Sequence, residues 1–146
     1  MITISKPKHG WSTLTIPCEN ETCNISLSYI QNIPFYFLDT FINYLNDVNN
    51  TDDTMILNID EEGNTKKIIV DAYRTYIIDE ASKHLYVSEM DFLQFMRECI
   101  EEFEKNIEKW SEFCIFEKIE KNYETIKMQN RIFMKGKIEI IRKKIG

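Results

Sequence analysis

The sequence is poor in the residues that interrupt regular secondary structure. Its 146 residues include only four glycines and three prolines, so flexible or proline-rich linkers between separate domains are not expected. A chain of this length fits one domain, and it can bury roughly two-thirds of its unfolded surface without help from disulfides or metals. We therefore expect a single domain with a core of its own.

Long apolar runs are also missing. No stretch approaches the roughly 20 consecutive apolar residues that a membrane-spanning helix needs, and residues 1–11 lack the apolar segment of a signal peptide. We therefore expect no membrane span and a cytoplasmic location. In that compartment the cysteines are expected to stay reduced.

The sequence has few of the residues that build catalytic or metal sites. It holds two histidines, His9 and His84, and neither lies in a recognisable motif. The cysteines form two pairs, Cys18 with Cys23 and Cys99 with Cys114. The first pair barely meets the ligand spacing of structural zinc sites, and the second does not. Phosphate-binding loops, nucleophile elbows and metalloprotease motifs are absent. We expect no enzyme, no cofactor and no metal.

Charge is unevenly distributed along the chain. The net charge is -6, which disfavours nucleic-acid binding because that function needs a basic surface. Residues 117–146 hold nine Lys or Arg against four Glu, so residues 1–116 carry a net -11. The acidic part could steer a basic protein partner towards itself, or it could serve only as a solubilising surface.

The strongest periodicity runs from Ser88 to Cys114. Its apolar residues recur every three or four positions, typical of an amphipathic helix. These residues are Leu93, Met96, Ile100, Phe103, Ile107, Trp110 and Cys114. Ser88 is the expected N-cap, with Asp91 three residues later.

The periodicity continues beyond Cys114 in a shifted register. Its apolar residues there are Phe116, Ile119, Tyr123, Ile126 and Phe133. Two arrangements fit this shift: one long bent helix, which we favour because no Gly or Pro marks a turn near residue 114, or a second helix that folds back. Gly136 is expected to interrupt the helix that follows.

Shorter segments of alternating character precede this helix. They predict strands near residues 2–4, 11–16, 23–30, 54–60, 66–80 and 84–87. The segment 66–80 contains either a bulge near Asp71–Arg74 or two strands. Phe35–Val48 is expected to form a helix, because Leu38, Phe41 and Leu45 share one face.

Together these patterns predict an α+β fold. We expect an antiparallel meander sheet, one crossing helix, and a long C-terminal helix, bent or paired, on one face of the sheet. Residues 1–115 would form the α+β domain, and residues 116–146 a C-terminal helical extension of it.

Exposed tyrosine, arginine and acidic residues of the expected sheet are the best candidates for protein contact, since Tyr and Arg often carry binding energy at interfaces. A cluster of carboxylates precedes Gly63, but it lacks the ligand spacing of a calcium loop. The candidate protein-binding residues are Tyr29, Asp60, Glu61, Glu62, Tyr73, Arg74 and Tyr76.

Two segments of the chain carry a family resemblance. In the first, residues 4–11 lead through residues 27–34, where a strand ends in Ser28-Tyr29 just before Ile33-Pro34. In the second, Val87-Ser88 opens an acidic helix that reaches Glu108-Lys109-Trp110. Together, over residues 2–113, they resemble small bacterial proteins that are similar to the immunity proteins of polymorphic toxin systems. The resemblance implies a non-enzymatic protein that binds and blocks a cognate toxin.

Two other functions fit the same sequence. The apolar stripe of the C-terminal helix could join two copies of the chain into a homodimeric assembly module. A pocket between sheet and helix could bind a small ligand or substrate.

Overall fold

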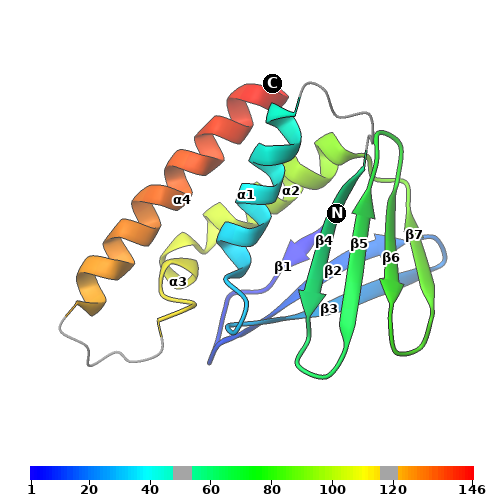
Figure 1. Ribbon diagram of the computed structural model, residues 1–146, viewed down its shortest axis with the longest axis horizontal. Coiled ribbons are helices and arrows are strands. Elements are labelled where there is room, and N and C mark those ends of the chain that lie inside the picture. The colour runs from blue at the N-terminus through cyan, green and yellow to red at the C-terminus, as the bar shows by residue number, and fades with distance from the viewer. Residues whose placement is uncertain (48–53, 116–121) are drawn as a thin grey trace.

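The computed structural model describes residues 1–47, 54–115 and 122–146. These residues form seven strands and four helices (Figure 1), which confirms the α+β class. The strands are β1 (Thr3–Ile4), β2 (Trp11–Cys18), β3 (Glu21–Ser28), β4 (Met55–Asp60), β5 (Thr65–Val70), β6 (Thr75–Asp79) and β7 (Leu85–Ser88). The helices are α1 (Ile33–Asn46), α2 (Phe92–Lys105), α3 (Ile107–Ser111) and α4 (Tyr123–Ile145).

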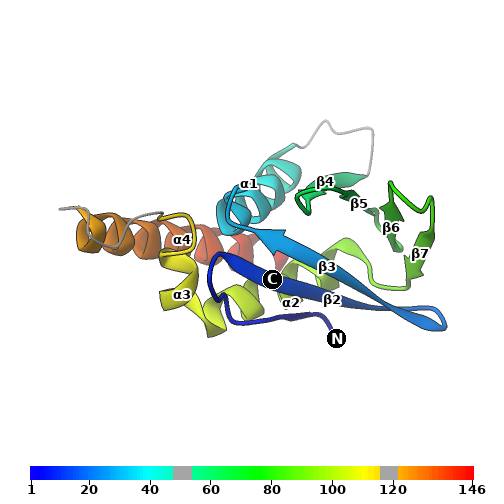
Figure 2. The same cartoon turned by 90° about the horizontal axis from the view of Figure 1, so that it is seen from below.

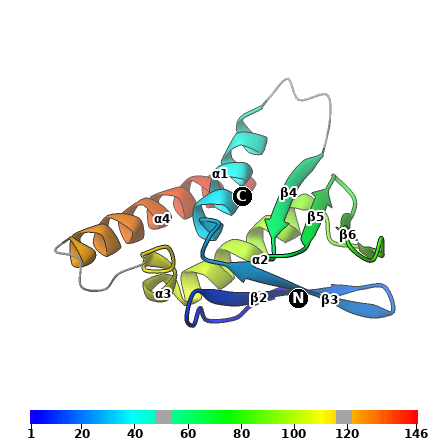
Figure 3. The same ribbon diagram turned by 60° about the horizontal axis from the view of Figure 1, so that its bottom comes forward.

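The strands divide into two antiparallel sheets instead of the single meander that the sequence predicts. One sheet has the order β1-β2-β3 and the other the order β4-β5-β6-β7. In Figures 1 and 3, β2 and β3 run across β4–β7. The sheets separate at β3 and β4, where the backbone N–H of Ser26 donates to the side chain of Glu61 at 2.8 Å.

The segment from 66 to 80 forms two strands, which settles the alternative that its sequence left open. Asp71 opens the turn between them: its backbone N–H donates to the carbonyl of Arg74 at 3.0 Å. Its carboxylate accepts hydrogen bonds from the backbone N–H groups of Tyr73 and Arg74, at 2.8 and 2.7 Å. Side chains of this type stabilise turns by satisfying local N–H groups.

Aromatic residues join the helices at the centre of the core. Phe37 of α1 packs edge-on against Phe103 of α2, with ring centroids 5.5 Å apart. Phe103 in turn packs against Trp110 of α3 at 5.1 Å. All three side chains are buried, and edge-to-face aromatic pairs add to the stability gained from burial. One aromatic chain therefore fixes three helices relative to one another.

The predicted helix over 88–114 begins later than expected and is broken. Asp91, not Ser88, is the N-cap of α2, and its carboxylate accepts a hydrogen bond from the N–H of Gln94 at 2.9 Å. Ser88 instead belongs to β7 and pairs with Thr75. Helix α2 ends at Lys105, and Asn106 separates it from α3. Strand pairing therefore takes up Ser88, and the second residue of the chain that favours an N-cap position, Asp91, begins the helix.

Helix α4 is a separate element that lies along α1, α2 and α3, so the expected single bent helix is wrong and the helices are paired (Figures 1 and 2). It buries Met134, Ile138 and Ile141 against the rest of the chain. It also continues through Gly136, which therefore does not interrupt it. Phe116 and Ile119 of the predicted stripe lie outside the described residues.

Basic residues attach α4 to acidic residues of the other helices. Both guanidinium nitrogens of Arg142 donate to the carboxylate of Glu104, at 2.7 and 2.8 Å. Three further ion pairs are Arg131–Glu108 at 2.8 Å, Lys137–Asp39 at 2.5 Å and Lys127–Glu112 at 3.4 Å. The opposite charges of the basic C-terminal segment and the acidic body therefore meet within one chain.

We expect Phe103→Ala to lower the free energy of unfolding by about 3–5 kcal/mol, because it leaves a cavity between three helices. Glu101→Ala, on the exposed side of the same helix, should change it by less than about 0.5 kcal/mol. Urea denaturation followed by circular dichroism measures both. Equal stability of the two variants would contradict the central position of Phe103.

Glu112 should make the docking of α4 dependent on pH. Burial acts to raise its pKa, but hydrogen bonds from Tyr123 and Lys109 outweigh burial and hold the pKa below the usual 4.5. A carboxyl with a lowered pKa stabilises the fold above about pH 4.5, and this stability is lost as the pH falls through the folded-state pKa.

Glu112→Gln should therefore lower the free energy of unfolding at neutral pH by about 1–3 kcal/mol and flatten its decline below pH 4.5. Denaturant titrations between neutral and acidic pH measure this difference. A variant whose pH profile parallels that of the wild type would refute the role of Glu112.

Candidate protein-binding surface

The outer face of the sheet β4–β7 carries an apolar row that crosses all four strands. Residues 55, 57 and 59 of β4 point into the core, so the residues between them point outwards. The strand register places Ile56 beside Ile69, Ile69 beside Tyr76, and Tyr76 beside Val87. Ile56 is 46% exposed, and the other three residues of the row are half-buried.

A second row lies beside the first and is more polar. It contains Asn58, Lys67, Ile78 and Leu85 in register, and Leu85 is 50% exposed. In Figure 1, β2 and β3 cross behind β4–β7, and no described helix covers the side of the sheet that faces the viewer. We call this side, with its two rows, the open sheet face.

The edges of the first sheet are occupied by side chains of its own chain. The N–H groups of Ile2 and Ile4 at the edge of β1 donate to Glu98 and Glu102 of α2, at 2.6 and 3.1 Å. At β3 the N–H of Ser26 donates to Glu61. These groups would otherwise be free to pair with a strand from another protein.

The edges of the second sheet are occupied in a similar way. The amide group of Gln31 donates to the carbonyl of Asn58 at 2.7 Å and accepts from the N–H of Asp60 at 3.0 Å. The N–H of Asn58 donates to the hydroxyl of Tyr36 at 2.8 Å. At β7 the carbonyl of Val87 accepts from the N–H of Glu19 at 2.8 Å. A partner protein can therefore contact the side chains of the open sheet face more easily than the backbone groups at a sheet edge.

Four of the predicted contact residues lie on or beside the open sheet face. Tyr76 is part of its apolar row. Tyr73, which is 80% exposed, and Arg74 belong to the turn that leads into β6, and only Thr75 separates Arg74 from Tyr76. Asp60 lies on the same face, at the end of β4 away from that turn. These residues place polar and aromatic groups around an apolar centre.

The other three predicted residues make contacts within the fold. Glu61 pairs with Lys66 at 2.9 Å and accepts the hydrogen bond from Ser26. Glu62 accepts a hydrogen bond from the hydroxyl of Ser28 at 2.6 Å. Tyr29 follows β3 and borders a surface hollow away from the open sheet face. The structure does not bring these three together with Tyr76.

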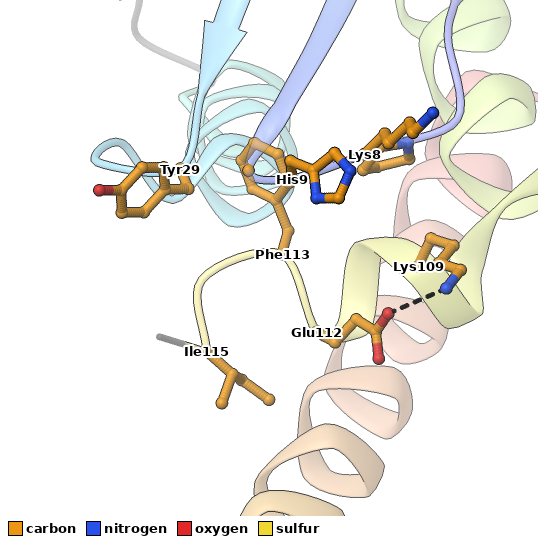
Figure 4. Close-up of a pocket in the computed structure, with 9 residues that line it drawn as sticks. Lys8, His9, Tyr29, Lys109, Glu112, Phe113 and Ile115 are labelled. Carbon is orange, nitrogen blue, oxygen red and sulfur yellow. Dashed lines mark hydrogen bonds and ion pairs between the residues drawn. The ribbon is translucent and has the colours of Figure 1, made fainter. Parts of the chain in front are cut away.

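The hollow beside Tyr29 has a volume of about 510 Å³ and is bordered by the β1–β2 turn and α3 (Figure 4). His9 and Gly10 form this turn with φ angles of 53° and 78°, as a two-residue hairpin turn requires. A Cβ atom on Gly10 would lie 2.6 Å from Cδ1 of Tyr29. Lys109, the basic residue that α3 contributes, is paired with Glu112 at 3.3 Å.

The four thiols are held in their protonated form. Burial, and then the nearby Cys18, raise the pKa of Cys23 to about 12. Burial raises the pKa of Cys114 to about 11 and also raises the pKa values of Cys18 and Cys99. Since the thiolate is the nucleophile and the metal ligand, these cysteines are poorly suited to either role at neutral pH.

His84, which lies between β6 and β7, is exposed at the surface. The Nε2 atom of His84 lies 2.9 Å from a carboxylate oxygen of Glu21, and its ring packs edge-on against Tyr86. Within residues 1–47, 54–115 and 122–146, no three His, Cys, Asp or Glu side chains are placed to hold a metal ion. None of the helices described combines the length and the apolar character that crossing a bilayer requires.

No protein-family model, no curated protein and no solved structure matches this chain. The resemblance to immunity proteins therefore stays a prediction from the residues that carry it.

Several residues of the open sheet face were missed by the sequence prediction, although a signal for them exists. They are Ile56, Ile69, Ile78, Leu85 and Val87. The segments 55–57, 68–70 and 76–78 are apolar at consecutive positions, which is typical of strands with an apolar side chain on both faces. The sequence prediction gave each of these strands only one apolar face, so it did not include the apolar row of the open sheet face.

We expect alkylation of Cys114 at pH 8 to be about a hundredfold slower in the folded protein than in the unfolded chain. The reason is that its pKa of about 11 lies two units above the ordinary 9.0, so proportionally less thiolate is present. Its rate should still rise about tenfold per pH unit above pH 9, where an ordinary thiol levels off. Iodoacetamide labelling with peptide mapping, in buffer and in urea, measures this. Equal rates in both would refute the prediction.

Proposed function

We propose that this protein is a non-enzymatic binding protein of the immunity type, which neutralises a cognate bacterial toxin by covering its active site. The open sheet face is the proposed contact surface. The observation that carries the proposal is its apolar row Ile56, Ile69, Tyr76 and Val87, which crosses four strands and is bordered by Tyr73, Arg74 and Asp60.

The chemistry of this face supports protein binding. Interfaces commonly combine an apolar centre with a polar, solvent-accessible rim, and Tyr and Arg are enriched among the residues that dominate binding energy. Tyr73 and Arg74 are exposed in the β5–β6 turn, beside the middle of the row, and Lys67 and Asp60 add charge of both signs. The face therefore combines apolar area with groups that can select one partner.

The charge of the chain supports a partner with a basic surface. Several basic residues of α4 pair with acidic residues of α1, α2 and α3, and the chain still carries a net charge of -6. A net negative charge speeds association with basic proteins by electrostatic steering. We also propose the cytoplasm as the location, since an immunity protein acts where its toxin would act.

The test uses the toxin-like domains encoded beside the gene for this protein. Each is co-expressed with this protein in a bacterial host, and both growth rescue and affinity are measured. We expect one of them to be bound and neutralised. Tyr76→Ala should weaken binding by 2 kcal/mol or more, roughly thirtyfold in the dissociation constant. Leu85→Asp should weaken it as well, because it places a charge in the second row.

The matched control is Ile132→Asp on α4, where the side chain is 58% exposed, similar to Leu85. This variant should bind the toxin as the wild type does. Failure of every neighbouring product to bind would overturn the immunity proposal. Binding that tolerates the changes at Tyr76 and Leu85 would overturn the open sheet face as its surface.

A further inference from the structure

Helix α4 has apolar residues on the side that faces away from the protein. Met128, Ile132 and Phe133 are each 58% exposed, and Ile140 is 45% exposed. Ile132, Gly136 and Ile140 follow at intervals of four, so they lie along one side of the helix. A helix that is apolar both towards its core and towards solvent has a second packing surface. We call this surface the outer α4 face.

Gly136 lies at the centre of the outer α4 face. A Cβ atom at this position would meet no atom of the chain within 4 Å, so no internal packing requires glycine. Its conformation is helical, and only proline is less favourable than glycine in a helix interior. A residue without a side chain does have one effect here: it lets another helix approach the backbone closely, as small residues do where helices pack.

We propose that a second copy of this chain covers the outer α4 face, with the two α4 helices antiparallel across a two-fold axis at Gly136. In this arrangement, residues equally far before and after Gly136 lie opposite each other. Ile132 then meets Ile140 of the second copy, and each contact occurs twice because a two-fold interface is self-complementary. Phe133 is one position further along and packs beside the same Ile140.

The charges along α4 favour the antiparallel arrangement. Lys135 and Glu139 are exposed one helical turn apart on the same flank. The two-fold axis brings Glu139 of one copy close to Lys135 of the other, on both sides of the axis. The two Lys135 side chains flank the axis itself, and each is followed by Glu139 of the other copy, which also pairs with Lys143 of its own chain at 3.2 Å. In a parallel pair the two-fold axis would run along the helices and place these flanks on opposite sides of the interface, so Glu139 would not meet Lys135 of the other copy.

The internal ion pairs of α4 remove a further obstacle to self-association. Arg131, Lys137 and Arg142 pair with Glu108, Asp39 and Glu104 of the same chain. Without these pairs, two strongly basic helices would repel each other. The ion pairs also hold α4 in a fixed orientation, so that its outer face is presented as a rigid surface, which lowers the entropic cost of binding.

Sedimentation velocity of the full chain over a wide concentration range, up to millimolar, tests the proposal. We expect a monomer–dimer equilibrium. Ile132→Glu and Phe133→Glu should each raise the dissociation constant by roughly a hundredfold, because a charge would be buried against an apolar residue. The matched control is Leu85→Glu on the open sheet face, which should dimerise as the wild type does. Circular dichroism confirms that each variant is folded.

A wild-type chain that remains monomeric at all concentrations would overturn the proposal. So would a dimer that persists in both α4 variants, since another surface would then hold it. Toxin binding is measured separately on the Ile132→Asp variant, so this proposal and the immunity proposal fail independently.

Cysteine cross-linking tests the position of the axis. Gly136→Cys places two thiols at the axis, and mild oxidation by copper phenanthroline should join them in a disulfide-linked dimer. Thr125→Cys is the control on the same side of α4. Its two copies would be about 33 Å apart along the helices, while disulfide formation needs Cα atoms within about 7 Å. Cross-linking at 125 but not at 136 would exclude the antiparallel arrangement, and the wild-type chain shows the contribution of its own cysteines.

Discussion

Hydrogen bonds that backbone N–H groups at the free edges of strands donate to acidic side chains are the interaction on which this fold depends. Glu98 and Glu102 are one turn apart on α2, about 6 Å along the helix. The N–H groups of Ile2 and Ile4 that they accept are two residues apart, about 6.6 Å along a strand. Because the two spacings match, α2 closes the first sheet as another strand would. Loss of either carboxylate would leave a backbone donor without its partner, which is costly when the group is buried.

Side-chain closure also explains why there are two short sheets and why their faces matter. Glu61 occupies the edge of β3, and Gln31 and Tyr36 occupy the edge of β4, so these two neighbouring strands do not pair through their backbones. The same contacts connect each sheet to the element beside it. With its edges occupied in this way, the second sheet offers other proteins mainly the side chains of its open face. Side-chain hydrogen bonds at the strand edges therefore stabilise the fold and also leave the open sheet face as the accessible part of the second sheet.

The sequence predicts the parts of this structure that depend on local periodicity. The alternation near β2, β3 and β4 and the face shared by Phe41 and Leu38 in α1 are read correctly, and the α+β class follows from them. The division into two sheets could not be predicted, because its cause is a contact between Ser26 and Glu61, which are 35 residues apart. Asp91 has a local capping signal of its own, since Asp is a preferred N-cap residue and Gln94 follows three positions later. Only the pairing of Ser88 with Thr75 shows which of the two candidate caps is used. Of the contact residues that the sequence predicts, Tyr73, Arg74, Tyr76 and Asp60 lie on or beside the open sheet face, while the apolar row could be derived only from the strand register.

The charge asymmetry of the chain acquires a different meaning once the fold is known. From the sequence, an acidic body and a basic segment suggest attraction to external partners. In the structure, Arg142 and Lys137 are paired with Glu104 and Asp39, so much of this attraction holds α4 in place. Exposed apolar residues lie on two separate surfaces, the open sheet face and the outer α4 face, and the chain keeps a net charge of -6. Figure 3 shows the strands β5 and β6 at one end of the molecule, while α4 runs from its middle, beside α1, to the other end. Two copies joined through the outer α4 face would therefore keep both open sheet faces accessible, and a dimer could bind two partner molecules at once.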